Sequence, residues 1–435
     1  MPKIALIGAG SVVFANTLTV DILSIPELRD SSLSLMDIDE DRLELSGRVG
    51  QAFIDKHKLP AKVEWTTDRR RALDGADYVI VMVQIGGLSA VEMDINIPMA
   101  HGLDQDIGDT LGPGGVFRGV RTIPVLLDMC KEMEELCPKA LLINYSNPMA
   151  INCWGLGGGQ DKIKFVGLCH SVQGTAGQLA HYSKIPFEET SYWVGGINHM
   201  SWFLKFEWKG EDAYPLLRKA MDDPEVCKHD KVRFEIMRHF GYFVTESSYH
   251  MSEYVPYFRK RPDLIEEFLM PRYNYLRMCR EDWKPHYEHK KKQVSGEEPL
   301  PELSVSGEYC SRIIHAIETN QPYRLNGNVP NTGLITNLPD GCIVEVPILV
   351  DAAGLHPCFI GDLPSQCAAL NRTNINVQEL AAQAALEGDP DKLRMAIALD
   401  PHTAATMDLR SIRKMVDEMI AAERKLRPEF LRGQG

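Results

Sequence analysis

The chain has 435 residues and a formal net charge of −13, with 44% hydrophobic and 25% charged residues. This composition is ordinary for a globular protein, and the length exceeds that of most single domains, which predicts two of them. The negative charge disfavours nucleic acids and anionic membranes as partners, and no apolar run approaches the roughly 20 residues that span a bilayer. Ten cysteines occur without CxxC pairs, which indicates reduced thiols and a cytoplasmic location.

The first 170 residues alternate between short apolar runs and helical patterns. Several runs are apolar throughout, as in parallel strands that are buried on both faces. We expect strands at residues 3–8, 33–37, 62–66, 77–84, 140–145 and 164–169, with helices at 17–24, 41–56 and 125–136 between them. This alternation predicts an α/β fold with an N-terminal, Rossmann-type, doubly wound parallel sheet.

The pattern changes after about residue 195. Strand-like runs at 200–208 and 342–350 are mixed with helical stretches at 232–239, 378–386 and 412–424. We therefore expect residues 1–195 and residues 196–435 to form two domains, the second being an α+β domain that closes over the first. A Pro-, Gly- and Glu-rich stretch at 293–303 predicts an exposed loop, and the basic run at 289–292 predicts a solvated helix end.

A glycine-rich turn follows the first predicted strand. Gly8-Ala9-Gly10-Ser11 lies between a strand and a helix, where such a turn binds the pyrophosphate of a dinucleotide, although Val13 replaces the third glycine of the fingerprint. Asp37 ends the second strand; a carboxylate there accepts hydrogen bonds from ribose hydroxyls and repels a 2′-phosphate, which favours NAD over NADP. Gly86 follows the fourth strand, where the backbone passes close to the nicotinamide.

Polar residues follow the ends of the next two strands. Asn147 comes after the fifth strand and Cys169-His170 after the sixth, so they converge at the edge where open α/β sheets bind ligands. His199 lies thirty residues after Cys169. A thiolate and an imidazole would suit Mn, Co, Ni or Fe, with substrate oxygens completing the coordination shell. The alternative is that these residues are structural, because their spacing follows no metal-binding rule.

These motifs resemble those of the family 4 glycoside hydrolases, which are NAD-dependent glycosidases. The resemblance extends in order along nearly the whole chain. It rests on the segments GAGS (8–11), LMDID (35–39), QIGG (84–87), DTLGPGG (109–115), NYSNPM (144–149), GLCHSVQ (167–173), GINHM (196–200), TESS (245–248) and NRTNIN (371–376).

The resemblance implies a redox-assisted elimination. NAD⁺ would remove a hydride from C3 of the sugar, and the resulting ketone would make the C2 proton acidic. A base would then take that proton while a divalent metal, most simply Mn²⁺, stabilises the enediolate. The glycosidic oxygen would leave, water would add, and the hydride would return to C3.

The resemblance also implies roles for individual residues. Cys169 and His199 match the metal ligands, Asn147 matches a substrate-binding residue, and Asp109 matches a polar residue that supports the base. His170 stands where relatives carry an acidic residue that protonates the leaving oxygen, and a histidine can do this near neutral pH.

The base is expected between residues 247 and 257. Ser248 stands where an aspartate is expected, which leaves Tyr249 and Tyr254 as candidates, with Tyr254 favoured. A metal-bound enediolate lowers the demand on the base, so a tyrosinate could serve.

The resemblance further implies a substrate and an assembly. The Cys-His-Ser-Val segment (169–172) resembles that of enzymes acting on unphosphorylated α-galactosides such as melibiose, with α-glucosides, α-glucuronides and α-galacturonides as alternatives. Relatives suggest a homodimer or homotetramer.

Two functions outside this family stay open on the residues alone. A 2-hydroxyacid dehydrogenase of the lactate and malate type shares the first domain and would use His199 with Arg118 or Arg121. A non-catalytic NAD-sensing protein would keep Cys169 and His199 as structural residues.

Overall fold

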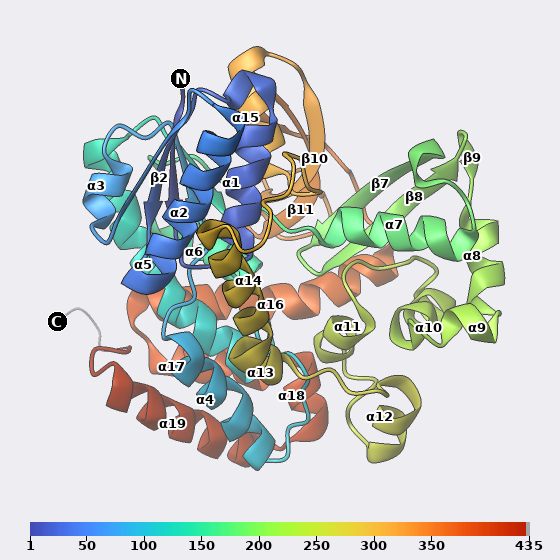
Figure 1. The fold of residues 1–435 in the computed structure, drawn as a ribbon. Helices are drawn as coiled ribbons and strands as arrows, with labels where there is room; N and C mark the ends of the chain where they lie inside the picture. Colours follow the sequence, from blue (N-terminus) through green and yellow to red (C-terminus); the bar gives the residue numbers. More distant parts are fainter. Residues whose placement is uncertain (432–435) are drawn as a thin grey trace.

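The computed structural model describes residues 1–431, which contain a twelve-stranded mixed sheet with helices on both faces (Figure 1). The strand order is β3-β2-β1-β4-β5-β6-β10-β11-β7-β8-β9, and β12 pairs with β11. The strands are β1 (Lys3–Ile7), β2 (Ser32–Met36), β3 (Lys62–Thr66), β4 (Tyr78–Val81), β5 (Leu141–Asn144), β6 (Phe165–Gly167), β7 (Thr190–Ile197), β8 (Met200–Trp208), β9 (Glu211–Asp212), β10 (Tyr323–Pro330), β11 (Ile343–Asp351) and β12 (Gly354–Pro357).

The first six strands are parallel and form the Rossmann-type half of the sheet. All six lie where the sequence predicts them, within a few residues at their ends. The apolar pattern explains why, since all four residues of β4 and the last four of β1 are buried. The predicted α/β class and the doubly wound parallel sheet are confirmed.

The second half of the chain extends the same sheet with antiparallel strands. β6 meets β10 at the pair Gly167–Asn328, and β11 meets β7 at the pair Glu345–Gly196. β8 coincides with the predicted strand at 200–208, and β11 lies one residue beyond the predicted 342–350. The expected boundary between residues 195 and 196 falls inside β7, and the division into two domains stays a prediction.

The helices cover both faces of the sheet and form a layer at its lower edge in Figure 1. They are α1 (Phe14–Ser24), α2 (Glu40–His57), α3 (Arg69–Leu73), α4 (Gly87–Ala100), α5 (Gly112–Leu136), α6 (Met149–Gly159), α7 (Ser171–Ser183), α8 (Tyr214–Met221), α9 (Pro224–Cys227), α10 (Lys231–Phe240), α11 (Ser248–Tyr254), α12 (Pro262–Phe268), α13 (Tyr275–Arg277), α14 (Trp283–Ser295), α15 (Cys310–Thr319), α16 (Ser365–Glu387), α17 (Pro390–Leu399), α18 (Pro401–Thr406) and α19 (Leu409–Leu426), with short turns at Pro26–Leu28, Phe187–Glu189 and Met278–Asp282.

Two helices begin well before the predicted residues. α5 begins at Gly112 because Pro113 fits the first turn of a helix, whereas the glycines around it read as a loop. A Cβ on Gly114 would lie 2.3 Å from the Gly108 carbonyl oxygen, so this glycine lets the preceding loop pack on the helix. The first half of α16 was missed because polar Asn371 interrupts its apolar pattern. The structure buries this asparagine, whose side chain accepts a hydrogen bond from Trp202 and donates one to the Met200 carbonyl.

The basic run lies at a helix end as expected, whereas the predicted loop starts too early because residues 293–295 still belong to α14 and Gln293 is buried. The loop begins at the end of α14, and the basic residues lie on the last turns of that helix, where His289 and Lys292 form ion pairs with Glu298. Among residues 1–431, no helix is both long enough and apolar enough to cross a membrane.

Candidate active site

The glycine turn after β1 borders a cavity of about 860 Å³. Gly8 has a φ of 94°, and a Cβ there would lie 2.6 Å from the Met82 carbonyl oxygen. The Gly10 amide donates to Asp37 Oδ2 at 2.8 Å, and a Cβ on Gly10 would meet that carboxylate at 2.7 Å. Gly8, Gly10, Ser11 and Asp37 all line the cavity. The chain therefore holds the backbone and carboxylate groups that suit a dinucleotide.

Gly86 lies between two residues that line this cavity. It is the N-cap of α4 with a φ of 89°, and its neighbours Ile85 and Gly87 line the cavity. A Cβ on Gly86 would lie 2.7 Å from the Arg427 guanidinium, so the glycine lets this arginine approach the backbone.

Cys169 and His199 come together at the carboxyl edge of the sheet. Cys169 follows β6, and His199 occupies the hairpin turn between β7 and β8 with a φ of 62°. The Cys169 Sγ lies 3.3 Å from His199 Nε2. A non-glycine residue in this left-handed region costs of order 1 kcal/mol or more, and such strain is concentrated at functional sites.

Both members of this pair are uncharged in the absence of a bound cation. Burial, aided by nearby His250, lowers the pKa of His199 to about 4, so its imidazole is neutral and can act as a ligand. Burial, aided by Glu345, raises the pKa of the Cys169 thiol to about 12, and a bound cation would release that proton. Within residues 1–431 no group of three or more His, Cys, Asp or Glu side chains could hold a metal ion. If Cys169 and His199 held a metal, substrate or water oxygens would have to complete its coordination shell.

A buried carboxyl group lies behind the hairpin that carries His199. Glu345 on β11 is fully buried, and its Oε2 lies 2.7 Å from Ser201 Oγ while its Oε1 accepts from Asn328 at 3.4 Å. Burial raises the pKa of Glu345 to about 7. The folded state therefore holds this proton more tightly than the unfolded chain does.

We expect Glu345→Gln to stabilise the protein at alkaline pH. Because the folded pKa lies above the ordinary value of 4.5, Glu345 costs stability progressively as the pH rises from 4.5 through 7, and glutamine carries no such cost. The stability gain of the variant should grow by on the order of 2–3 kcal/mol between pH 5 and pH 8. Thermal and urea unfolding in chelator measure this; an identical pH dependence of variant and parent would contradict it.

Asp109 lies on the loop before α5 and faces several polar groups. Its Oδ2 is 3.5 Å from both Asn147 Nδ2 and Arg118 Nη1, and its buried Oδ1 has no hydrogen-bond partner. Glu253 fixes this loop by accepting from the three successive backbone amides of residues 106–108. The structure therefore brings Asp109 and Asn147 together.

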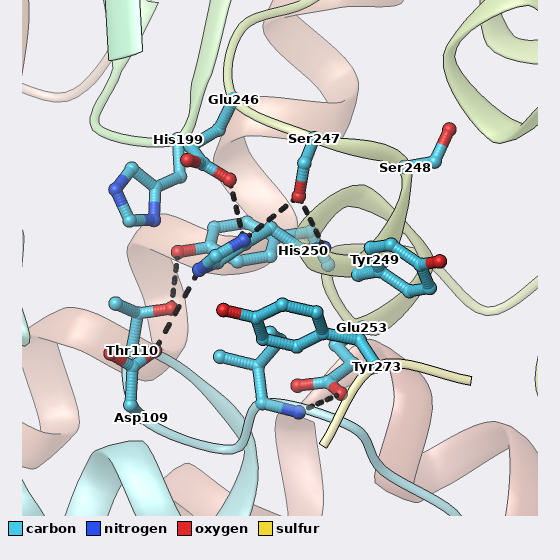
Figure 2. A network of polar contacts seen from close by, with 12 residues as sticks. Asp109, Thr110, His199, Glu246, Ser247, Ser248, Tyr249, His250, Glu253 and Tyr273 are labelled. Atoms are coloured by element: carbon cyan, nitrogen blue, oxygen red, sulfur yellow. Dashed lines mark hydrogen bonds and ion pairs between the residues drawn. The ribbon is translucent and has the colours of Figure 1, made fainter. Parts of the chain in front are cut away.

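His250 is the main site residue that sequence reasoning missed. Its Nδ1 lies 2.5 Å from Glu246 Oε2, its Nε2 lies 3.8 Å from Asp109 Oδ1, and its ring is 4.7 Å from the His199 ring (Figure 2). Burial opposes its protonation, but the carboxylates of Glu246, Asp109 and Glu253 together outweigh burial and raise the pKa of His250 to about 9. The protonated imidazole of His250 thus lies beside the expected metal ligand His199. Its position four residues before Tyr254 on one helix was the available signal.

The two candidate bases point in different directions. Tyr254 is buried, its hydroxyl donates to Thr110 Oγ1 at 2.8 Å, and its ring lies 6.3 Å from the His199 ring. Burial raises the pKa of Tyr254 well above its ordinary value. Tyr249 instead donates to the Pro271 carbonyl at 2.7 Å and lies away from His199 (Figure 2).

His170 is the most accessible of the expected catalytic residues. It caps the N-terminus of α7, and its side chain is 66% exposed. Its Nδ1 lies 3.7 Å from Glu308 Oε1, so a carboxylate from the loop before α15 faces it. The imidazole can therefore exchange protons with solvent while remaining next to Cys169.

Family models match the chain over most of its length. Residues 3–185 match the family 4 glycosyl hydrolase model, and residues 194–403 match the family 4 glycosyl hydrolase C-terminal domain. The chain belongs to family 4 of the glycosyl hydrolases. This membership decides against the dehydrogenase and the NAD-sensing protein.

Several relatives span nearly the whole chain. An alpha-galactosidase from Bacillus subtilis is 42% identical over 99% of this chain and 100% of its own length, and one from Rhizobium meliloti is 40% identical over 98% and 89%. An alpha-glucosidase from Erwinia rhapontici is 30% identical over 97% and 98%.

Solved structures share the fold. A 6-phospho-alpha-glucosidase from gut microorganisms, solved with NAD and Mn²⁺, superimposes with a TM-score of 0.82 at 21% identity, over 97% of this chain and 98% of that chain. Malate dehydrogenase from Plasmodium falciparum gives a TM-score of 0.53 at 14% identity, over 90% and 100%. The expected likeness to the lactate and malate dehydrogenases is confirmed for the fold.

Proposed function

We propose that this glycosidase cleaves unphosphorylated α-galactosides such as melibiose, with NAD and a divalent metal, most simply Mn²⁺, as cofactors. The observation that carries the proposal is the pair formed by partly buried Cys169 and buried His199, 3.3 Å apart at the same sheet edge as the glycine turn. The 42% and 40% identity to two alpha-galactosidases supports the choice of sugar. Arg118, already engaged with Asp109 and Tyr275, is poorly placed to bind a sugar phosphate.

Cys169 and His199 would hold the metal, and Gly8, Gly10 and Asp37 would hold the dinucleotide. When bound, these cofactors supply a reversible hydride acceptor for C3 of the sugar and positive charge beside its C2 and C3 oxygens. His199 is buried, and a site screened from bulk water strengthens the local electrostatics.

The proposed base is Tyr254, acting on the C2 proton. A tyrosinate in a buried site needs positive charge nearby, and His250 lies four residues earlier on α11, hence on the same face of the helix. His250 is itself fixed by Glu246 and Asp109. We assign Asp109 the role of holding this cation, and Asn147 that of a hydrogen-bond partner for sugar hydroxyls.

The proposed acid is His170. Its exposed imidazole can donate a proton to the leaving glycosidic oxygen and recover one from solvent, and Glu308 orients it from 3.7 Å. We also propose a cytoplasmic location, consistent with ten free thiols in residues 1–431, and a homodimer or homotetramer in solution.

Cleavage of p-nitrophenyl α-galactoside tests this function. Enzyme stripped of nucleotide is assayed with Mn²⁺ and thiol, with and without NAD⁺, alongside the α-glucoside, α-glucuronide and α-galacturonide. We expect NAD⁺-dependent cleavage of the galactoside without accumulation of NADH. Cleavage of one of the other glycosides but not of the galactoside would assign the enzyme to that sugar instead. Steady NADH production without sugar release would contradict the proposal that the enzyme is a glycosidase.

A further inference from the structure

A second wall of the dinucleotide cavity comes from the later half of the chain. This wall, residues 278–284, contains a turn of π-helix (Met278–Asp282) followed by the start of α14. π-helical turns occur preferentially at functional sites. The wall residues Met278, Cys279, Arg280, Trp283 and Lys284 line the same cavity as the glycine turn.

Trp283 meets the turn that follows Asp37. The Arg42 guanidinium carbon lies 4.1 Å from the centroid of the Trp283 ring. Asp39 holds Arg42, with Nε 3.3 Å from Oδ2, and the Asp39 amide donates to Asp37 Oδ1 at 3.0 Å. The stacked pair is therefore linked through Asp39 to the carboxylate that would bind the adenosine ribose.

An exposed apolar side chain also lines the cavity four residues before Arg42. Ile38 lies between Asp37 and Asp39, lines the cavity and is 88% exposed. The adenine ring of a dinucleotide is flat and has two apolar faces. Such a ring binds favourably to aliphatic side chains, indole rings and guanidinium planes. Ile38, Arg42 and Trp283 together offer all three surfaces to the cavity.

The wall is anchored on both sides of Trp283. The Tyr275 amide donates to the Asp106 carbonyl at 3.2 Å, and Arg280 donates twice to Glu92 Oε1 on α4, at 3.0 and 2.7 Å. On the far side, Lys56 of α2 donates to the Leu300 carbonyl at 2.8 Å. Arg280 therefore fixes the wall to α4, and Arg42 contacts the indole itself, which lowers the ordering required when a ligand binds.

We propose that Trp283, with Arg42 and Ile38, binds the adenosine half of the dinucleotide. The later half of the chain then completes the cofactor site that the glycine turn begins. This inference rests on the proposed function, because NAD is the cofactor assigned there.

Nucleotide binding to the full-length enzyme, freed of bound nucleotide, tests the proposal. Tryptophan emission and calorimetry are followed during titration with NAD⁺, AMP and nicotinamide mononucleotide. We expect NAD⁺ and AMP to quench the emission and the mononucleotide to leave it unchanged. Trp283→Leu should remove the quenching and raise the Kd for NAD⁺ and AMP roughly tenfold, the effect of losing one stacked base. Trp283→Phe, which keeps an aromatic face, should bind within about threefold of the parent.

Trp208→Leu is the matched control. Trp208 also carries a cation on its ring, Lys209 at 5.4 Å, but it ends β8 near the opposite end of the sheet. This variant should keep the parent's Kd and quenching. The proposal is overturned if Trp283→Leu or Trp283→Phe, folded by circular dichroism, shows the opposite pattern: unchanged AMP affinity in the first or a tenfold loss in the second. Failure of the parent to bind NAD⁺ would instead overturn the cofactor assignment and this inference together.

Discussion

Cys169→Ser is expected to lower kcat/KM on an α-galactoside by roughly a thousandfold or more. A serine hydroxyl is a poor ligand for a borderline divalent ion, and a metal supplies several kcal/mol of charge stabilisation to such a reaction. Metal content and the Mn²⁺ concentration needed for activity should both change, whereas the Kd for NAD⁺ should not. In the parent enzyme, chelation should abolish activity, and Mn²⁺ should restore it better than Mg²⁺ because a thiolate prefers softer ions.

Cys358→Ser provides the matched control. Cys358 follows β12 as a free, partly exposed thiol and takes no part in the site. It should retain the parent's activity and metal dependence. Activity of Cys169→Ser close to that of Cys358→Ser, or parent activity that survives exhaustive chelation, would contradict a metal held by Cys169.

Tyr254→Phe is expected to lower kcat by about 10²–10⁴-fold, the usual contribution of a general base. Removing one hydroxyl that bonds only to Thr110 Oγ1 changes the packing little, so KM should stay within a few-fold of the parent value. Steady-state kinetics with a p-nitrophenyl galactoside, together with NAD⁺ affinity, measure this.

Tyr249→Phe makes the same change on the same helix. Its hydroxyl donates to the Pro271 carbonyl rather than facing His199, so activity should remain near that of the parent. Near-full activity in Tyr254→Phe, or a larger loss in Tyr249→Phe, would exclude Tyr254 as the base and direct attention to His250.

The fold was predictable where a continuous apolar run in the sequence marks a strand that is buried on both faces. The strands of the parallel half are short apolar runs between helices, and each lies within a few residues of its predicted position. β7 and β10 were missed because glycines and polar residues interrupt them, among them Gly195, Gly196, Asn326 and Asn328. Their strand structure follows from pairing across the sheet, which local sequence does not specify.

The candidate site was predictable where residues follow strand ends. Cys169, Asn147 and Asp37 were identified because topology brings strand ends to one edge. Other site residues depend on tertiary contacts: His250 is defined by Glu246 and Asp109, and Trp283 by its packing on Arg42 of α2. Glu246 lies only four residues before His250, but no spacing rule connects His250 with Asp109 or Trp283 with Arg42.

Exchange at C2 of the sugar tests the central claim most directly. Methyl α-galactoside carrying deuterium at C2 is cleaved by the NAD⁺- and Mn²⁺-loaded enzyme in ordinary water, and the galactose released is analysed by NMR or mass spectrometry. The account predicts loss of the C2 label to solvent. Elimination transfers the deuteron from C2 to the base, where it exchanges with water before C2 is protonated again. Galactose that keeps its full C2 label would contradict elimination and require direct displacement at the anomeric carbon.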